Sequence, residues 1–392
     1  MKQLYDENSF LFDFEAIVTT CSYDHEKKIY KVSLDQTAFF PEGGGQLSDQ
    51  GFFNFVFENR EESLPVLDVQ KEGDIVFHYL PSPLQIGTKI RGKIDEKRRW
   101  DFMQQHSGEH IFSGLVHQYF GADNVGFHLG LWEVTLDFNQ LLTLEQLRFI
   151  ELKANQAIWK NIPIETSYPK EEILKTLEYR SKLDLTQNVR IVTIPGYDTC
   201  ACCAPHLKTT GQIGQIKVID VSAHRGGVRV TILCGERALK DYTIKQDNIF
   251  SISSSLSVPQ NETAQGVERV KEELASCKEA NHILETKLLK EKIKVLPSSA
   301  ETNHVLLFTD LAPEIAIRNV INHLVQEYKG YVGIFWGDDT MGYRYLIGSK
   351  HLDCCQINQK LRDLFHAKGG GKSPMVQGSV TAPRKELEAL FY

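Results

Sequence analysis

Two short motifs far apart in the chain repeat one spacing, and together they constrain the fold more than any other feature. The first is His106-Ser-Gly-Glu-His110, and the second is Cys202-Cys-Ala-Pro-His206. Helical periodicity covers the first motif, so its two imidazoles lie on one helix face and can point at one ion. The later thiolate and imidazole complete a set of three nitrogens and one sulfur, which prefers zinc. We therefore expect the fold to bring both segments together.

Spacing alone leaves two points open at this site. Cys200 and Cys203 lie next to Cys202 and could supply the thiol in its place. Surface His pairs and Cys-rich turns used as apolar filler are common, but two matching pairs make both alternatives weak. Glu109 precedes the second histidine, whereas zincins carry glutamate directly after the first. Its carboxylate could orient a water, bind an ammonium group or simply be solvated.

The bulk composition is typical of a soluble protein with several domains. At 392 residues the chain exceeds one core, so we expect about two to four domains. The eight cysteines of a long chain suggest metal binding or reduced thiols more than disulfides. Neither a membrane-length apolar run nor a secretory signal pattern is present, which predicts a cytosolic protein. A net charge of −7 argues against a general nucleic-acid coat but allows a local basic patch.

Apolar patterning predicts an α+β fold in four parts. Residues 1–92 alternate short β-branched runs with Gly and Pro clusters, as in a small β-barrel or sandwich. Residues 93–240 mix helical and strand patterns and would form an α+β domain around the metal motifs. Residues 299–392 alternate strands and helices, with a loop at 368–374, which predicts a C-terminal α/β sandwich.

The remaining part, residues 241–298, is expected to be a helical linker. Pro259 and Asn261 mark the start of one long helix that would end near residue 296. Its apolar residues follow heptad spacing. This heptad seam comprises Val267, Val270, Leu274, Cys277, Asn281, Leu284 and Leu288. The pattern fits equally a helix packed on its own chain and a coiled coil that joins two copies.

The motifs resemble the editing domain shared by alanyl-tRNA synthetases and the free-standing AlaX proteins. The long AlaX subtype has the same order of parts: barrel, editing domain, helix and a C-terminal DHHA1 domain. Four further stretches carry the resemblance: Thr37–Gln46 in the barrel, Arg225–Val230 and Cys234–Ala238 at the end of the editing domain, and Lys368–Gly378 in a DHHA1-like glycine loop. By this resemblance the metal ligands are His106, His110, Cys202 and His206, which selects Cys202 among the thiols.

The resemblance implies a zinc-dependent trans-editing hydrolase that removes serine, or glycine, from mischarged tRNA-Ala. The residues implied at the reaction are Glu109, Gly44 and Gln46. Those implied at the tRNA backbone are Lys368, Gly369, Gly370, Gly371 and Lys372. Partners would be tRNA-Ala and a second copy of the chain, joined through the 259–296 helix and the C-terminal domain. The Gly43–Gly45 turn would be a donor loop beside the substrate, or only a hairpin turn.

Some features limit the functional prediction. Ala204-Pro205 replaces the family's usual Gly-Thr, and Glu109 stands where many synthetases carry threonine, so the choice between serine and glycine stays open. Arg98 and Arg99 could reach the tRNA acceptor end or be solvated. The chain begins with the barrel, so we expect no ATP-dependent charging. Two other classes remain: a non-catalytic tRNA-binding protein with a structural zinc, and a DHH-related phosphoesterase, disfavoured because no Asp-His-His triplet occurs.

Overall fold

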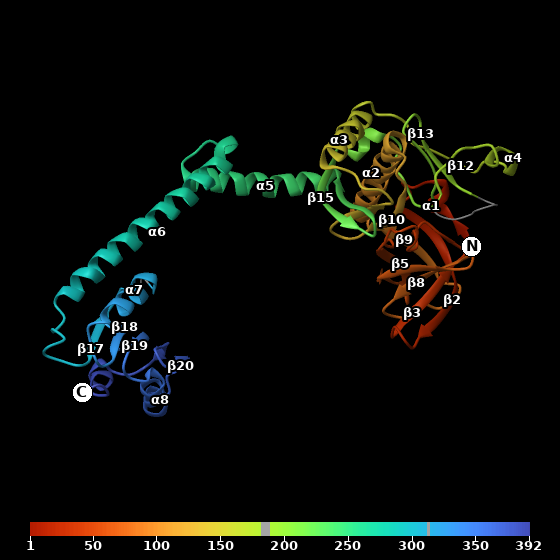
Figure 1. Ribbon diagram of the computed structural model, residues 1–392. Helices are drawn as coiled ribbons and strands as arrows, with labels where there is room; N and C mark the ends of the chain where they lie inside the picture. The colour runs from red at the N-terminus through yellow and green to blue at the C-terminus, as the bar shows by residue number, and fades with distance from the viewer. Residues whose placement is uncertain (182–188, 312–313) are drawn as a thin grey trace. The chain divides into compact units, whose positions relative to one another are not determined.

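The computed structural model describes residues 1–181, 189–311 and 314–392, and the chain divides into two compact units. Unit 1 is Met1–Asn248 and unit 2 is Ile249–Tyr392. Each unit combines helices with β-sheet, which agrees with the expected α+β class (Figure 1). Within the described residues, no helix has the length and apolar character needed to cross a membrane.

Unit 1 begins with a seven-stranded antiparallel sheet in the order β6-β5-β9-β2-β3-β8-β7. The strands are β2 (Asp13–Asp24), β3 (Ile29–Leu34), β5 (Gly51–Phe57), β6 (Arg60–Val66), β7 (Asp68–Glu72), β8 (Ile75–Leu80) and β9 (Lys89–Ile94). A bulge between Val18 and Thr20 divides β2, which pairs with β9 before it and with β3 after it. Both halves of the sheet therefore cover one core that includes Val32, Phe39 and Phe53. This single sheet occupies the place of the predicted barrel or sandwich.

A long helix, α2 (Glu96–Phe120), forms the centre of the rest of unit 1. It starts at Asp95, whose carboxylate accepts a hydrogen bond from the N–H of Arg98, and ends at Gly121, which has a φ of 63°. Its middle is buried on all sides, polar residues included. Around it lie α3 (Leu144–Trp159) and an antiparallel sheet of β10 (Asn124–Leu129), β11 (Val134–Phe138), β16 (Gly227–Cys234) and β15 (Ile216–His224).

A smaller sheet carries the second ligand motif to this helix. It consists of β12 (Glu165–Ser167), β13 (Ile191–Ile194) and β14 (Asp198–Ala201), with α4 (Glu171–Leu174) after β12 and the 3₁₀ turn η1 (Thr210–Ile213) after the motif. Strand β14 packs directly against α2. Gly114 permits this contact, because a Cβ there would lie 2.3 Å from the carbonyl oxygen of Tyr197. The fold thus brings the two motifs together, as their matching chemistry predicts.

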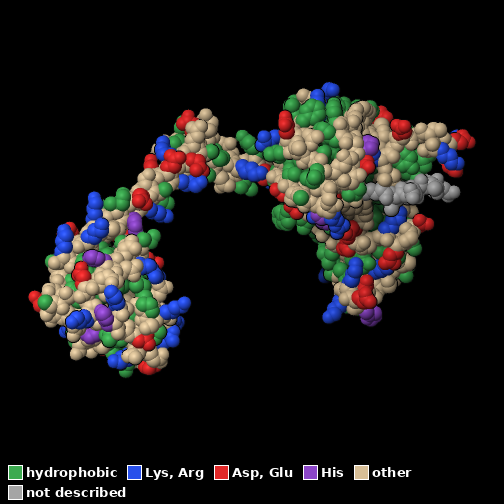
Figure 2. Space-filling model, in the orientation of Figure 1, with side chains coloured by type: hydrophobic (Ala, Val, Ile, Leu, Met, Phe, Trp, Pro, Cys, Tyr) green, Lys and Arg blue, Asp and Glu red, His purple; other side chains and the backbone are tan. Residues whose placement is uncertain are grey.

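The linker region is helical but differs in detail from the prediction. Helix α5 (Gly235–Leu256) continues through residue 240, and the two units divide at 248–249. The 3₁₀ turn η2 (Gln260–Glu262) follows Pro259 and leads into α6 (Thr263–Lys294), close to the expected helix. All seven residues of the heptad seam are exposed, so within the described residues of unit 2 the seam is not covered. Figure 2 shows charged side chains of both signs along this helix.

Unit 2 contains the expected α/β sandwich. Its sheet has the order β17-β18-β19-β21-β20, with β17 parallel to β18 and the other pairs antiparallel. Its elements are β17 (Val305–Thr309), α7 (Glu314–Leu324), β18 (Val332–Asp338), β19 (Gly342–Gly348), α8 (Cys354–Phe365), β20 (Lys368–Lys372), β21 (Met375–Val380) and α9 (Arg384–Glu388). Ile334 packs with α7 and Phe335 packs with α8, so the two helices cover opposite faces (Figure 1). The apolar pattern predicts a helix that begins at about residue 312, and its first two residues, 312 and 313, lie outside the described residues.

The predicted glycine loop is wrong, because Lys368–Lys372 forms the edge strand β20 and pairs with β21. A Cβ at Gly369 would lie 2.5 Å from both the carbonyl oxygen of Gln377 and the hydroxyl of Tyr345. Glycine here lets the two strands close over the buried tyrosine. Consecutive glycines suggest a loop when local sequence alone is considered. The pairing of β20 with β21 over Tyr345 depends on residues that are distant in the sequence.

The candidate metal centre and its cleft

The four predicted ligands form one group, in which the three histidines are buried and Cys202 is partly buried. His106 and His110 project from α2, while Cys202 and His206 follow β14. Their ligand atoms all lie within 4.8 Å of one another. The Sγ atom of Cys202 lies 3.5 Å from Nε2 of His106 and 3.3 Å from Nε2 of His206. Three imidazoles and a thiol arranged in this way could hold a metal ion.

Each histidine of the group is oriented by a partner on its other ring nitrogen. The Nδ1 distances are 2.8 Å from His106 to Oε1 of Gln46, 2.9 Å from His110 to Oδ2 of Asp198, and 3.0 Å from His206 to Oγ of Ser107. A partner at Nδ1 leaves Nε2 directed at the centre of the group. Partners of this kind fix the ring orientation of metal-binding histidines and strengthen binding.

Asp198 connects the group to a second charged residue. Arg180 donates two hydrogen bonds to its carboxylate, at 2.7 Å and 2.9 Å. Burial by itself would raise the pKa of Asp198, but the hydrogen bonds from His110 and Arg180 lower that pKa below its ordinary value. Asp198 therefore remains ionised behind His110. Sequence reasoning missed both residues, and the available signal was a carboxylate four residues before Cys202.

The three neighbouring thiols have different surroundings. Among the described residues, only Cys202 shares a group with all three histidines. Burial would raise the pKa of Cys202, but His106 and His206 hold that pKa well below the usual value. Cys200 belongs to a second group with His110 and Asp198, and burial raises its pKa to about 11. Burial also raises the pKa of Cys203 to about 11. The geometry and the charges both favour Cys202 as the thiolate.

The glycine turn of the first sheet lies against the metal group. Gly45 accepts a hydrogen bond from the N–H of Leu129 at 2.7 Å, and a Cβ on Gly45 would lie 2.5 Å from the carbonyl oxygen of Phe127. Gly44, with a φ of 60°, lies near the thiol of Cys203. The turn is thus both a tight hairpin turn, with Gly43 bridged to Gln46, and a wall of the cleft described below. The Gln46 side chain is buried against His106 and is not among the residues that line that cleft.

Glu109 is buried at the inner end of the same site. Its Oε1 accepts hydrogen bonds from Ser113 Oγ at 2.6 Å and from Asn124 Nδ2 at 2.7 Å. Its Oε2 lies 3.9 Å from Nε2 of His110. Burial raises the pKa of Glu109, but His110 and Arg180 more than offset this effect and the pKa stays below its ordinary value. The interpretation of Glu109 as a solvated helix-face residue is wrong.

An open cleft of about 2150 Å³ leads to the metal group. Its walls are the Gly43–Gly45 turn, part of β10 and the segment from Asp198 to Cys203, and His106, Glu109 and His110 lie at its base. Small-molecule sites usually have volumes of about 300–1,000 Å³. The cleft therefore has room for the end of a larger ligand.

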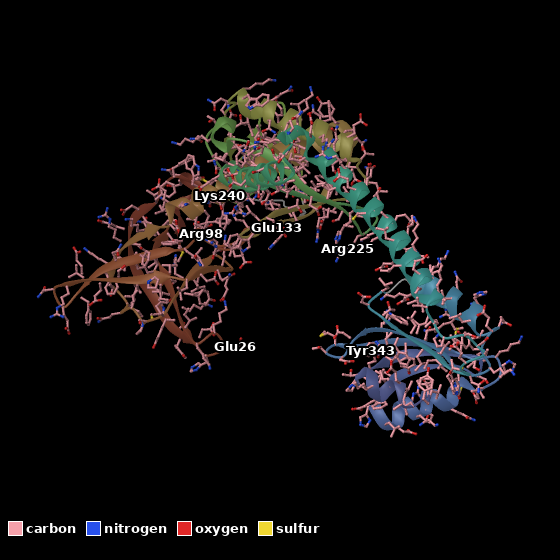
Figure 3. All side chains as sticks on the ribbon, turned by 90° about the vertical axis from the view of Figure 1, so that its left-hand side faces the viewer. Glu26, Arg98, Glu133, Arg225, Lys240 and Tyr343 are labelled. Carbon is pink, nitrogen blue, oxygen red and sulfur yellow. The ribbon has the colours of Figure 1, made fainter. Side chains whose placement is uncertain are left out.

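The two arginines at the start of α2 have structural roles. Arg99 is fully buried, forms an ion pair with Asp49 and donates to the carbonyl oxygen of Ala38. Arg98 donates to the carbonyl oxygen of Ser48 at 3.0 Å, and its guanidinium lies over the ring of Phe102. Figure 3 shows Arg98 at the junction between the first sheet and the rest of unit 1. Arg99 is thus neither solvated nor free to contact a ligand.

In unit 2, part of the predicted tRNA-binding segment lines a separate pocket of about 660 Å³. Lys368, Gly369 and Gly370 lie along one wall, and Arg318 and Trp336 are among the other lining residues. Gly371 and Lys372 are exposed at the end of β20 and do not line this pocket. The glycine strand therefore presents a backbone edge with cations beside it.

Comparison with known proteins defines the class to which unit 1 is similar. The family model of the threonyl and alanyl tRNA synthetase second additional domain matches residues 189–230, which include Cys202 and His206. The model of class II (A) tRNA synthetases matches residues 7–98, which include all seven strands of the first sheet. Unit 1 is therefore similar to domains of alanyl-tRNA synthetases.

Individual relatives extend this similarity over nearly the whole chain. The chain is 28% identical to the alanine–tRNA ligase of Ignicoccus hospitalis, over 99% of its own length and 42% of the ligase. It is 26% identical to the alanyl-tRNA editing protein Aarsd1-A of Xenopus laevis, over 92% of this chain and 88% of that protein. It is 33% identical to the putative alanyl-tRNA editing protein alaX of Saccharomyces cerevisiae, over 59% of this chain and 57% of that protein. The chain thus spans less than half of the ligase but most of the frog protein, and it is similar to AlaX-type editing proteins.

Proposed function

We propose that the chain is a zinc-dependent deacylase that hydrolyses the ester between serine and the terminal ribose of mischarged tRNA-Ala, with glycine as a second substrate. The observation that carries this proposal is the open cleft, which joins the glycine turn to the buried His and Cys group. The cleft has room for the aminoacylated end of a tRNA. Relatives named alanyl-tRNA editing proteins support the same substrate, and the protein would act in the cytoplasm.

The donor set supports zinc as the metal. With bonds of about 2.3 Å to sulfur and about 2.0 Å to nitrogen, a tetrahedral zinc site has sulfur and nitrogen about 3.5 Å apart. The distances from Cys202 Sγ to His106 and His206, 3.5 Å and 3.3 Å, fit this spacing. Bound zinc would supply positive charge beside the ester. Four protein ligands leave no open position, which favours a role in holding the site over activation of a water.

The chain's own residues would position the ester and stabilise charge. An aminoacyl ester is already activated, so these two effects supply most of the required rate enhancement. Gly44 fits the role of a donor to the ester oxygen, because within the described part of the chain its N–H makes no hydrogen bond. Glu109 would act at the amino-acid end, and Gln46 would act through His106 by holding its ring.

The long-subtype architecture, with a DHHA1-like domain that binds tRNA in unit 2, is part of this proposal. The edge of β20 would contact the tRNA backbone through Lys368, Gly369, Gly370, Gly371 and Lys372. Replacing Lys368 and Lys372 by Ala should weaken tRNA binding and reduce its salt dependence by about two charges. Unchanged binding and an unchanged salt slope would contradict this assignment.

A direct assay separates the proposal from its two rivals. Zinc-loaded protein should release serine from Ser-tRNA-Ala and spare correctly charged Ala-tRNA-Ala, while Gly-tRNA-Ala tests the second substrate. A non-catalytic tRNA-binding protein would bind these tRNAs without releasing the amino acid. A DHH-related phosphoesterase would instead cleave a phosphodiester. Serine release no faster than in buffer would reject the deacylase.

A further inference from the structure

The two carboxylate oxygens of Glu109 have different surroundings, because Oε1 accepts two hydrogen bonds and, within the part of the chain that the structure describes, Oε2 has only the 3.9 Å contact with His110. Ser113 and Asn124 both donate to Oε1, and Ser113 Oγ also accepts from Asn124 Nδ2 at 3.0 Å. These three hydrogen bonds fix the orientation of the carboxylate, and both of the bonds that it accepts go to Oε1, so neither Ser113 nor Asn124 occupies Oε2. Among the described residues, three buried side-chain atoms lack a partner, and neither oxygen of Glu109 is one of them, so Oε2 is not sealed inside the protein. Because Glu109 lines the cleft, Oε2 can meet a ligand there.

The surroundings of Glu109 lack a dedicated cation. In the described part of the chain, its one ion pair is the 3.9 Å contact with His110, whose Nε2 faces the candidate metal centre. The guanidinium of Arg180 is already bound by both oxygens of Asp198. Glu109 also belongs to neither candidate metal group. A carboxylate held by two neutral donors at the base of a cleft is suited to a cation that arrives with the ligand.

We propose that Glu109 Oε2 binds the α-ammonium group of the aminoacyl ester and thereby restricts hydrolysis to esters with a free amine. This inference rests on the proposed function. In an amino-acid ester, one carbon separates the α-nitrogen from the ester carbonyl carbon, and the two atoms lie about 2.5 Å apart. The oxygen of Glu109 lies 3.9 Å from the histidine nitrogen that faces the centre. An ester carbonyl that lies beside the centre therefore places its ammonium within reach of Glu109.

The proposal makes Glu109 a specificity residue for the backbone of the amino acid and not for its side chain. Serine, glycine and alanine esters all carry the ammonium, so another part of the cleft must distinguish them. N-acylated esters, such as those of peptidyl-tRNAs, would lose the ion pair and leave a buried carboxylate without its partner. They would therefore be poor substrates.

The kinetic test combines a variant with a modified substrate. Glu109→Gln keeps an oxygen for Ser113 and Asn124 but removes the charge. We expect kcat/KM on Ser-tRNA-Ala to fall about 10- to 100-fold in this variant, and the wild-type protein to show a similar fall on N-acetyl-Ser-tRNA-Ala. For the Glu109→Gln variant, kcat/KM on N-acetyl-Ser-tRNA-Ala should be close to its kcat/KM on Ser-tRNA-Ala. Equal losses of Glu109→Gln on both substrates would show that Glu109 orients the attacking water and would overturn the proposal.

A binding test keeps the inference distinct from the proposed function. The probe is a non-hydrolysable amide, 3′-seryl-amino-3′-deoxyadenosine, compared with its N-acetyl form by calorimetry on zinc-loaded protein. The free amine should bind about 10- to 100-fold more tightly to the wild-type protein and without preference to Glu109→Gln. The matched charge control is Glu133→Gln, at an exposed residue between β10 and β11 (Figure 3) that is not among the residues lining the cleft, and it should behave like wild type. Preference for the amine without hydrolysis would reject only the deacylase; absence of preference would reject the role of Glu109.

Discussion

In unit 1 the three candidate histidine ligands are buried and Cys202 is partly buried, and each histidine has a hydrogen-bond partner behind it. In unit 2 the glycine strand β20 lies at the edge of a sheet, and Lys368 and Lys372 project into solvent. At the metal site of unit 1, substitution of one ligand or partner removes contacts on which the other ligands depend. At the second site, the backbone is fixed by pairing with β21 while the side chains are free. The metal motif is therefore constrained by the side chains that it brings together, whereas the glycine motif is constrained by the strand pairing of its backbone.

The largest effect that follows from this contrast is expected at His106. His106→Ala should lower zinc affinity, so that bound zinc falls well below one equivalent per chain after dialysis against a chelator, and should abolish serine release, because one of the four ligands is removed. Metal content after dialysis and the deacylation rate measure both effects. His128→Ala is the matched control, since His128 is exposed on β10 and lies outside the cleft. Full zinc retention in His106→Ala would refute the assigned ligand set.

A smaller loss should follow when the ligands stay and a partner changes. Asp198→Asn removes the charge that faces His110 and leaves Arg180 without its anion. Loss of such a partner typically lowers metal affinity about 10- to 100-fold. Titration with a competing chelator measures the affinity, and circular dichroism checks that the variant is folded. Asp220→Asn, at an exposed position of β15, is the control. Equal zinc affinity of Asp198→Asn and wild type would show that Asp198 does not act through the metal ligand.

Local sequence patterns predicted the features whose causes are local. The periodicity around His106 predicted the helix that the structure shows as α2, and the mixed helical and strand patterns of residues 93–240 predicted an α+β part, which the structure also shows. The α/β sandwich of unit 2 followed from alternating strand and helix patterns in the same way. Such features depend on residues within a few positions of each other, so a single sequence contains the necessary signal.

Contacts between distant segments could not be predicted in this way. Arg99 of α2 forms a buried ion pair with Asp49, which lies just before β5 of the first sheet. From local sequence alone, Arg99 could instead be a solvated surface cation. Asp198 and Gln46 reach His110 and His106 from separate strands and turns. These partners are chosen by tertiary packing, and no spacing rule along the chain identifies them.

The glycine strand offers a test in which packing and ligand contact can be separated. Gly369→Ala should destabilise unit 2 by about 1–3 kcal/mol, because its Cβ would meet Gln377 and Tyr345. Gly370→Ala should change stability by less than about 0.5 kcal/mol, because no atom lies within 4 Å of the added Cβ. Hydrogen exchange of the β21 amides measures the difference. Equal exchange in the two variants would show that the strand pairing does not depend on this close approach.

The heptad seam of α6 extends this comparison to an apolar surface, since its apolar residues are exposed within the described part of unit 2. If the seam joins two copies, a Leu274→Asp and Leu284→Asp double variant should reduce the mass in light scattering from twice 44.6 kDa to 44.6 kDa. Serine release should stay unchanged, because the metal group lies wholly in unit 1. The matched control replaces Glu272 and Glu279, which lie on the same helix outside the seam, by Gln. A wild-type mass of 44.6 kDa would exclude the coiled coil, because the protein would then be a monomer. A double variant that retains the dimer mass would also exclude it, because the two copies would then be joined through another surface.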